Sequence, residues 1–192
     1  MRLPTPRSKR LIGVTSMACA GLATVAVSLA LTTGPAAAAA PPACTSSQLV
    51  PWLNSTGSGT TGAIYYAIQF TNITAKSCTL TGYPGVSGVT LGGSQLGSAA
   101  VRNDTHKSFV ITLASGATAS TLSTTGISIL KITDVANYPA ATCKPVTAGG
   151  LRVYIPGQKA STVIPFPFRA CSKSGPTYLS VEPIEGGVSA AG

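Results

Sequence analysis

The sequence predicts an all-β protein, an antiparallel two-sheet β-sandwich of the immunoglobulin-like type that is held by two disulfides. About eight or nine short runs alternate apolar with polar residues and are separated by Gly, Pro, Ser and Asn, as in strands joined by turns. No stretch of ten or more residues has the apolar period of an amphipathic helix, so the crossover helices of a parallel sheet are not predicted. Four cysteines follow a leader of the export type, which favours disulfides.

The first 40 residues have the pattern of a cleaved signal peptide. Four cations precede the apolar stretch Leu11–Leu31, and a run of alanines at 36–40 supplies a small-residue cleavage site. A retained membrane anchor is the alternative, but no charged stop-transfer flank follows the apolar stretch. Cys19 lacks the preceding aliphatic residue of a lipoprotein signal, so we expect it to be removed. We therefore expect a secreted protein with no stable membrane insertion after cleavage.

The rest of the chain is predicted to form one domain over residues 41–185, with a disordered tail over 186–192. Nine cations and four acids follow residue 40, which gives a net charge of +5 (9 − 4). The cations are scattered singly, whereas nucleic-acid binding needs clustered cations. No nucleic-acid partner is expected, although an anionic cell-surface polymer could be attracted weakly.

The predicted strands begin with Leu49–Leu53, in which Pro51 indicates an edge position. Ala63–Asn72 is the clearest, because every second residue is apolar on one face while the other face is mixed. Val86–Leu91 changes phase near Gly88, which indicates a bulge.

The second half of the chain continues the alternation. Lys107–Leu113 has an apolar residue at every second position, and three small residues then turn the chain into Ala117–Leu122. Leu151–Ile155 alternates apolar residues with Arg and Tyr and ends at Pro-Gly. The remaining predicted strands are Ser128–Thr133, Val163–Phe168 and Tyr178–Glu182. The segments predicted to be loops are Asn54–Gly62, Asp134–Thr142 and Ser172–Thr177.

Four cysteines remain after cleavage, at Cys44, Cys78, Cys143 and Cys171. An even number in an exported domain implies two disulfides, for which three connectivities exist. The spacings of 34, 65 and 28 residues do not match the closely spaced pairs of a zinc site, so no metal is expected. We predict the sequence-nearest pairs, Cys44–Cys78 and Cys143–Cys171, because they close the shortest non-crossing loops.

No catalytic residues are predicted, and we expect neither an enzyme nor a cofactor. His106 is the one histidine, and a serine triad would need it as base with Asp104 or Asp134 to orient it. It lies instead in a polar turn. The segment 57–62 matches G-x-G-x-x-G, but it precedes a strand, whereas the dinucleotide motif follows one.

Phe166 and Phe168 form the candidate binding loop. The flanking prolines at 165 and 167 block strand pairing and could hold both rings outward, as in a binding loop, but we favour an edge strand that closes over the core. We expect a secreted, non-catalytic binding or interaction module whose partner is an extracellular protein or a cell-envelope polymer. A secreted inhibitor of an extracellular hydrolase is the alternative, and inward-packed rings would count against it. The candidate contact surface combines this segment with the loops Asn54–Gly62 and Asp134–Thr142.

Four sequence blocks carry a family resemblance. They read FTN at 70–72, CTLTGYPGV at 78–86, CKP at 143–145 and LRVYIPG at 151–157. With these blocks and its opening and closing cysteines, the chain resembles the secreted actinobacterial family called domain of unknown function 4232 over residues 43–184. The resemblance implies a β-sandwich with two disulfides, and it implies no activity.

Overall fold

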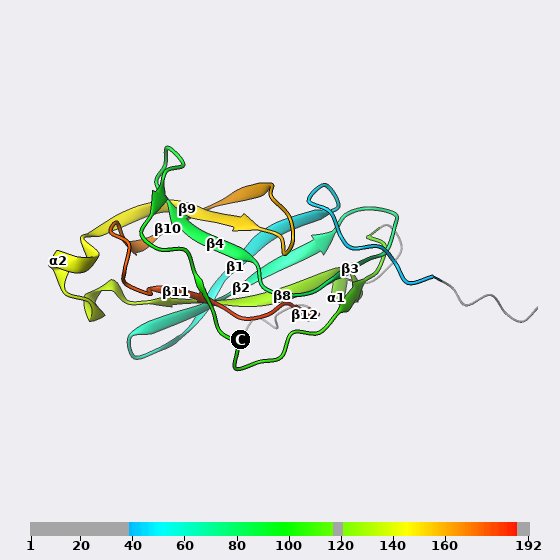
Figure 1. The fold of residues 1–192 in the computed structure, drawn as a ribbon, viewed down its shortest axis with the longest axis horizontal. Helices are drawn as coiled ribbons and strands as arrows, with labels where there is room; N and C mark the ends of the chain where they lie inside the picture. Colours follow the sequence, from blue (N-terminus) through cyan, green and yellow to red (C-terminus); the bar gives the residue numbers. More distant parts are fainter. Residues whose placement is uncertain (1–38, 117–120, 188–192) are drawn as a thin grey trace, which may run out of the picture. The chain divides into compact units, whose positions relative to one another are not determined.

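The structure is a computed structural model and describes residues 39–116 and 121–187 (Figure 1). The predicted signal peptide lies outside the described residues except for Ala39 and Ala40. Residues 117–120 of one predicted strand and 188–192 of the predicted tail also lie outside them. A search of the described residues finds no helix that is long and apolar enough to span a membrane.

β-Strands are the main regular structure of the described chain and its helical elements are short, which confirms the predicted fold class. The strands are β1 Leu49–Thr60, β2 Ala63–Asn72, β3 Cys78–Leu80, β4 Gly85–Val89, β5 Gln95–Leu96, β6 Val101–Arg102, β7 Ile111–Leu113, β8 Thr125–Thr133, β9 Pro145–Tyr154, β10 Ser161–Cys171, β11 Leu179–Val181 and β12 Glu185–Gly186. The short helical elements are α1 Thr121–Thr124, the 3-10 helix η1 Val135–Asn137 and α2 Ala140–Cys143.

Two sheets form the layers of the sandwich (Figure 1). The larger sheet has the order β1-β2-β8-β11-β6, with β12 also paired to β8, and the smaller sheet has the order β10-β9-β4-β5. This order matches A-B-E-D and G-F-C-C′ of immunoglobulin-type sandwiches, with β11 inserted between the counterparts of E and D. The pairs are antiparallel apart from β11–β6 and an isolated bridge at Ala43.

The loop predicted at Asn54–Gly62 is wrong, because residues 54–60 continue β1 as one arm of a hairpin. Thr60 pairs with Ala63, so the turn contains only Thr61 and Gly62, and Gly62 adopts the positive φ of +86° that such a turn favours. The small polar side chains of this arm are exposed from Ser55 onward. Such residues suit an edge strand, because its backbone hydrogen bonds are made to its neighbour β2 and need no apolar side chains.

The core fills the space between the sheets. Ile68, Phe70, Leu130 and Leu151 are fully buried there, and so is Tyr178. The Tyr178 hydroxyl donates a 2.9 Å hydrogen bond to the Leu96 carbonyl, as a buried tyrosine hydroxyl needs a partner.

The bulge predicted near Gly88 is wrong, since β4 pairs with β9 without a register shift. The apolar phase changes there because β4 is buried on both faces, with Ser87 only 4% exposed. A Cβ at position 88 would lie 2.8 Å from the Tyr178 hydroxyl. The buried Tyr178 side chain therefore occupies the space that a side chain at position 88 would need.

Both predicted disulfides are confirmed. Cys44–Cys78 joins the segment before β1 to β3, and Cys143–Cys171 joins α2 to the end of β10. The two bonds lie at opposite ends of the sandwich, since α2 and β3 are far apart (Figure 1). Each therefore fixes one end of the sandwich.

Three other boundaries differ from the predictions. The strand predicted at Lys107–Leu113 is reduced to β7, and Phe109 and Val110 are 66% and 68% exposed. The segment predicted as the loop Asp134–Thr142 contains η1 and most of α2. Gly186 was assigned to the tail but belongs to β12, where it pairs with Gly126 of β8.

Candidate functional site

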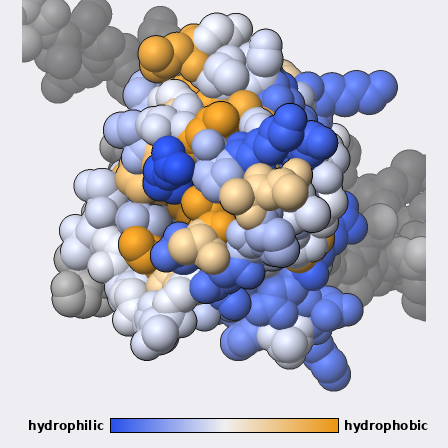
Figure 2. All heavy atoms as spheres, turned by 90° about the vertical axis from the view of Figure 1, so that its left-hand side faces the viewer, coloured by the Kyte–Doolittle hydropathy of each residue, from blue (hydrophilic) through white to orange (hydrophobic). Residues whose placement is uncertain are grey.

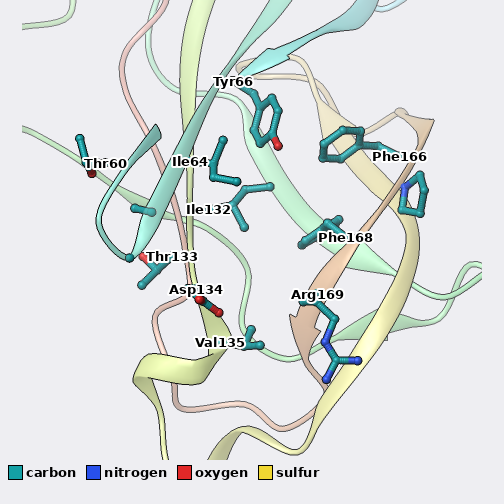
Figure 3. A pocket seen from close by; sticks show the side chains of 13 residues that line it. Thr60, Ile64, Tyr66, Ile132, Thr133, Asp134, Val135, Phe166, Phe168 and Arg169 are labelled. Carbon is teal, nitrogen blue, oxygen red and sulfur yellow. The ribbon is translucent and has the colours of Figure 1, made fainter. Parts of the chain in front are cut away.

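A cleft of about 520 Å³ opens between the two sheets at one end of the sandwich. β2 and β8 form one wall, β10 forms the other, and the β1–β2 turn and η1 border it. Apolar side chains line most of it and face one another across the space (Figure 3). They are Ile64, Tyr66, Ile132, Val135, Phe166 and Phe168.

Three aromatic rings make a continuous group in this cleft. The centroids of Tyr66 and Phe166 are 4.9 Å apart in an edge-to-face arrangement, and those of Phe166 and Phe168 are 5.9 Å apart and stacked. Both geometries are favourable for aromatic pairs. The rings from two sheets thus hold one another in place.

The local structure of β10 explains how the two phenylalanines reach the cleft. The register with β9 shifts between Pro165 and Phe168, where the prolines supply no N–H for the ladder. β10 is the edge strand of its sheet, and an edge tolerates such an interruption. Pro165 and Pro167 are exposed, while Phe166 and Phe168 are half-buried and pack against the core. The segment is therefore an edge strand packed on the core, as predicted for Val163–Phe168, and the outward-facing loop considered beside it is not observed.

Hydrogen bonds hold the border of the cleft. The Gly62 carbonyl accepts one from the Asp134 backbone N–H at 2.8 Å and one from Asn137 Nδ2 at 3.1 Å. The Asp134 carboxylate accepts a bond from the Ala136 N–H at 2.9 Å and so caps η1. The hairpin turn and η1 are consequently fixed to each other.

Polar groups lie where the cleft meets solvent. Thr60, Thr133, Asp134 and Arg169 contribute to its lining, and the Arg169 side chain forms no ion pair or hydrogen bond with another described residue. The Tyr66 hydroxyl likewise has no hydrogen-bond partner within the described chain. Figure 2 looks at the end that lies at the left of Figure 1 and shows apolar surface surrounded by polar residues. Ile64 is 45% exposed, so a ligand can reach apolar wall directly.

One comparison identifies the family. The family model described as domain of unknown function (DUF4232) matches residues 44–185. The chain belongs to this family. No curated protein matches it, and no solved structure does. The match extends from Cys44, the first disulfide cysteine, to β12, and therefore includes the whole cleft of this DUF4232 domain.

The three predicted contact segments meet at the cleft of the DUF4232 domain. Thr60 and Gly62 come from the first, Asp134 and Val135 from the second, and Phe166–Phe168 from the third. The sequence left open whether these segments share one end of the sandwich, and the structure brings them together. The sequence alone does not single out Ile64, Tyr66 and Ile132 as cleft residues, because inward-facing residues of a strand have the pattern of core residues. Their nearness to the ends of β2 and β8 was the available signal.

His106 and Asp134, a base and its orienting acid in a hypothetical triad, do not lie in one site of the DUF4232 domain. Asp134 borders the cleft, whereas His106 is exposed between β6 and β7, where its backbone carbonyl accepts a 3.4 Å bond from the Tyr83 hydroxyl. Within residues 39–116 and 121–187, no group of three or more His, Cys, Asp or Glu residues is placed to hold a metal ion. What the cleft offers is apolar contact with a polar border.

Proposed function

We propose that this DUF4232 domain is a secreted, non-catalytic binding module whose ligand site is the cleft between β2 and β10. The observation that carries the proposal is the meeting of three segments at one apolar, aromatic cleft of about 520 Å³. That volume lies within the range of ligand sites, which are mostly apolar with a few placed polar groups. The two disulfides support an oxidising, extracellular location.

The walls favour a ligand that presents an apolar or aromatic group. Tyr66, Phe166 and Phe168 offer ring faces and edges for such a group. Arg169, which has no ion-pair partner among the described residues, favours a neighbouring anion. An extracellular protein or a cell-envelope polymer could carry both features. A loop-type inhibitor is not proposed, because both phenylalanines pack inward against the core.

A fluorescent probe with the same chemistry tests the site. Anilinonaphthalene sulfonate combines aromatic rings with one anionic group, and its fluorescence rises when it enters an apolar site. We expect Ile64→Trp, which fills the cleft from its exposed wall, to weaken binding at least about fivefold. Ile73→Trp is the matched control, since Ile73 is 59% exposed and does not contribute to the cleft. Equal loss in both variants, or no probe binding by the parent protein, would contradict the proposal.

Two sets of alanine variants test whether the domain is catalytic. Replacing Phe166 and Phe168 by alanine should weaken any biological effect of the domain, because it removes cleft wall. His106→Ala and Asp104→Ala should leave the effect intact, since both side chains are exposed and remain outside the cleft. Loss of the effect in a folded His106→Ala variant would instead indicate that the domain is an enzyme.

A further inference from the structure

A second hollow, of about 400 Å³, lies on the outer face of the larger sheet. Tyr65 lines it, and its neighbours Ile64 and Tyr66 line the cleft, as alternation along a strand requires. Tyr65 pairs with Lys131, Lys131 with Ser180 of β11, and Ser180 with Val101 of β6. These side chains therefore form one row across four strands, on the face opposite to the cleft.

Two cations of this hollow are held in place but not neutralised. Lys131 Nζ lies 5.9 Å from the ring centroid of Tyr65, and Arg102 Cζ lies 5.6 Å from that of Tyr83, so each is stabilised by an aromatic ring. Neither forms an ion pair with a carboxylate among the described residues. Lys131 can therefore bind an anionic group of a ligand in the hollow without displacing a carboxylate partner of the described chain.

The hollow also offers an acceptor for hydroxyl groups and an apolar face. Glu182 accepts a 3.4 Å hydrogen bond from Asn103 Nδ2, and its other carboxylate oxygen has no partner within the described chain. A carboxylate accepts only, so it favours a ligand that presents a donor there. Ile129 and Val101 add apolar surface beside these groups. A sugar acid combines a carboxylate, hydroxyl donors and apolar C–H faces in one molecule.

The hollow continues beyond a single sugar ring. A smaller hollow of about 170 Å³ shares Ile129 and Glu182 with it and reaches Glu185 of β12. This second part offers the carboxylates of Glu182 and Glu185 and no cation among its lining residues, so it suits the hydroxyls of a neighbouring sugar whose own carboxylate points away from the sheet. We propose that the outer face of the larger sheet binds an acidic oligosaccharide, a glycan whose sugars carry carboxylates. The proposal does not depend on the function of the cleft.

Calorimetric titration with hexagalacturonate tests this proposal on the full domain. We expect binding that Lys131→Met weakens about tenfold, because a charge-assisted hydrogen bond is lost. Lys159→Met is the matched control: it removes the same charge from an exposed position outside the hollow and should change the affinity less than about twofold. Thermal unfolding of both variants verifies that they are folded.

Two further ligands separate an acidic sugar from its alternatives. The methyl-esterified hexamer keeps the hydroxyls and ring faces but lacks the charges, and we expect it to bind at least about tenfold more weakly. Hexametaphosphate has charge without sugar and should not compete at equal charge concentration. Equal binding of the methyl ester, equal competition by hexametaphosphate, equal loss in the two lysine variants, or no binding of hexagalacturonate would each overturn the proposal.

Discussion

Tyr178 gives the most direct test of the packing. Its ring and hydroxyl are fully buried, the hydroxyl donates to the Leu96 carbonyl at 2.9 Å, and burial raises the pKa of Tyr178 from 10.0 to about 12. Tyr178→Phe keeps the ring but removes the hydroxyl's hydrogen bond to the buried carbonyl. At pH 8 we expect the free energy of unfolding to fall by about 1–3 kcal/mol.

The pH dependence of this difference follows from the raised pKa. Because the folded-state pKa of Tyr178 lies above the unfolded value, the native fold favours the protonated phenol. This contribution is fully present below about pH 10 and is lost as the pH rises towards 12. The advantage of the parent protein over Tyr178→Phe should therefore shrink by at most about 1.4 kcal/mol per pH unit in that window.

Urea unfolding followed by circular dichroism measures this difference at pH 8 and at several values between about pH 10 and 12. The comparison with Tyr178→Phe at each pH removes the contributions of the other titrating groups, which the two proteins share. Parallel loss of stability in the two proteins across this window would refute the reasoning, because the buried phenol would then not be the group that resists ionisation.

Three other changes test features that hold the fold, each by its effect on the free energy of unfolding. Replacing Cys143 and Cys171 by alanine opens a loop of 28 residues and should remove about 3.6 kcal/mol in the chain-entropy model; a loss below about 1 kcal/mol would contradict it. Gly88→Ala should cost about 1–3 kcal/mol, because its Cβ would lie 2.8 Å from the anchored Tyr178 hydroxyl; a neutral effect would show that the ring can move. Asn72→Ala should cost at least about 2 kcal/mol, since the buried amide donates to two carbonyls and accepts from the Thr74 N–H and hydroxyl; a stable variant would show that water replaces the amide.

The sequence predicted the fold where the alternation was strong and failed where small residues formed strands. β2 has the predicted bounds of 63–72 because its apolar residues recur at every second position. The second half of β1, at 54–60, contains only Asn, Ser, Thr and Gly, so it has no apolar period to detect, and its pairing depends on β2. The disulfides were predictable because nearest pairing in sequence coincided with neighbouring elements in space.

Only one wall of the candidate cleft could be predicted, because the residues of the other wall have the same pattern as core residues. Phe166 and Phe168 were found because prolines set them apart from the other strands, whereas Tyr66 and Ile132 look like ordinary core residues. A period of two identifies the inward face of a strand, but it does not say where along that face the opposite sheet stops covering it. That boundary depends on how the sheets pack, which a single sequence does not encode locally.

The prolines of β10 bear on both the prediction for this segment and the geometry of the site. Pro165 and Pro167 remove two ladder donors, which left an outward loop open beside the predicted edge strand, and the register of β10 shifts at this point. Because the strand lies at a sheet edge, the interruption costs little ordered pairing. Phe166 and Phe168 then pack against the core and Tyr66, but they leave the space beside Ile64 and Ile132 open as the cleft. The prolines that disfavour a regular strand thus flank the two phenylalanines that form one wall of the proposed binding site.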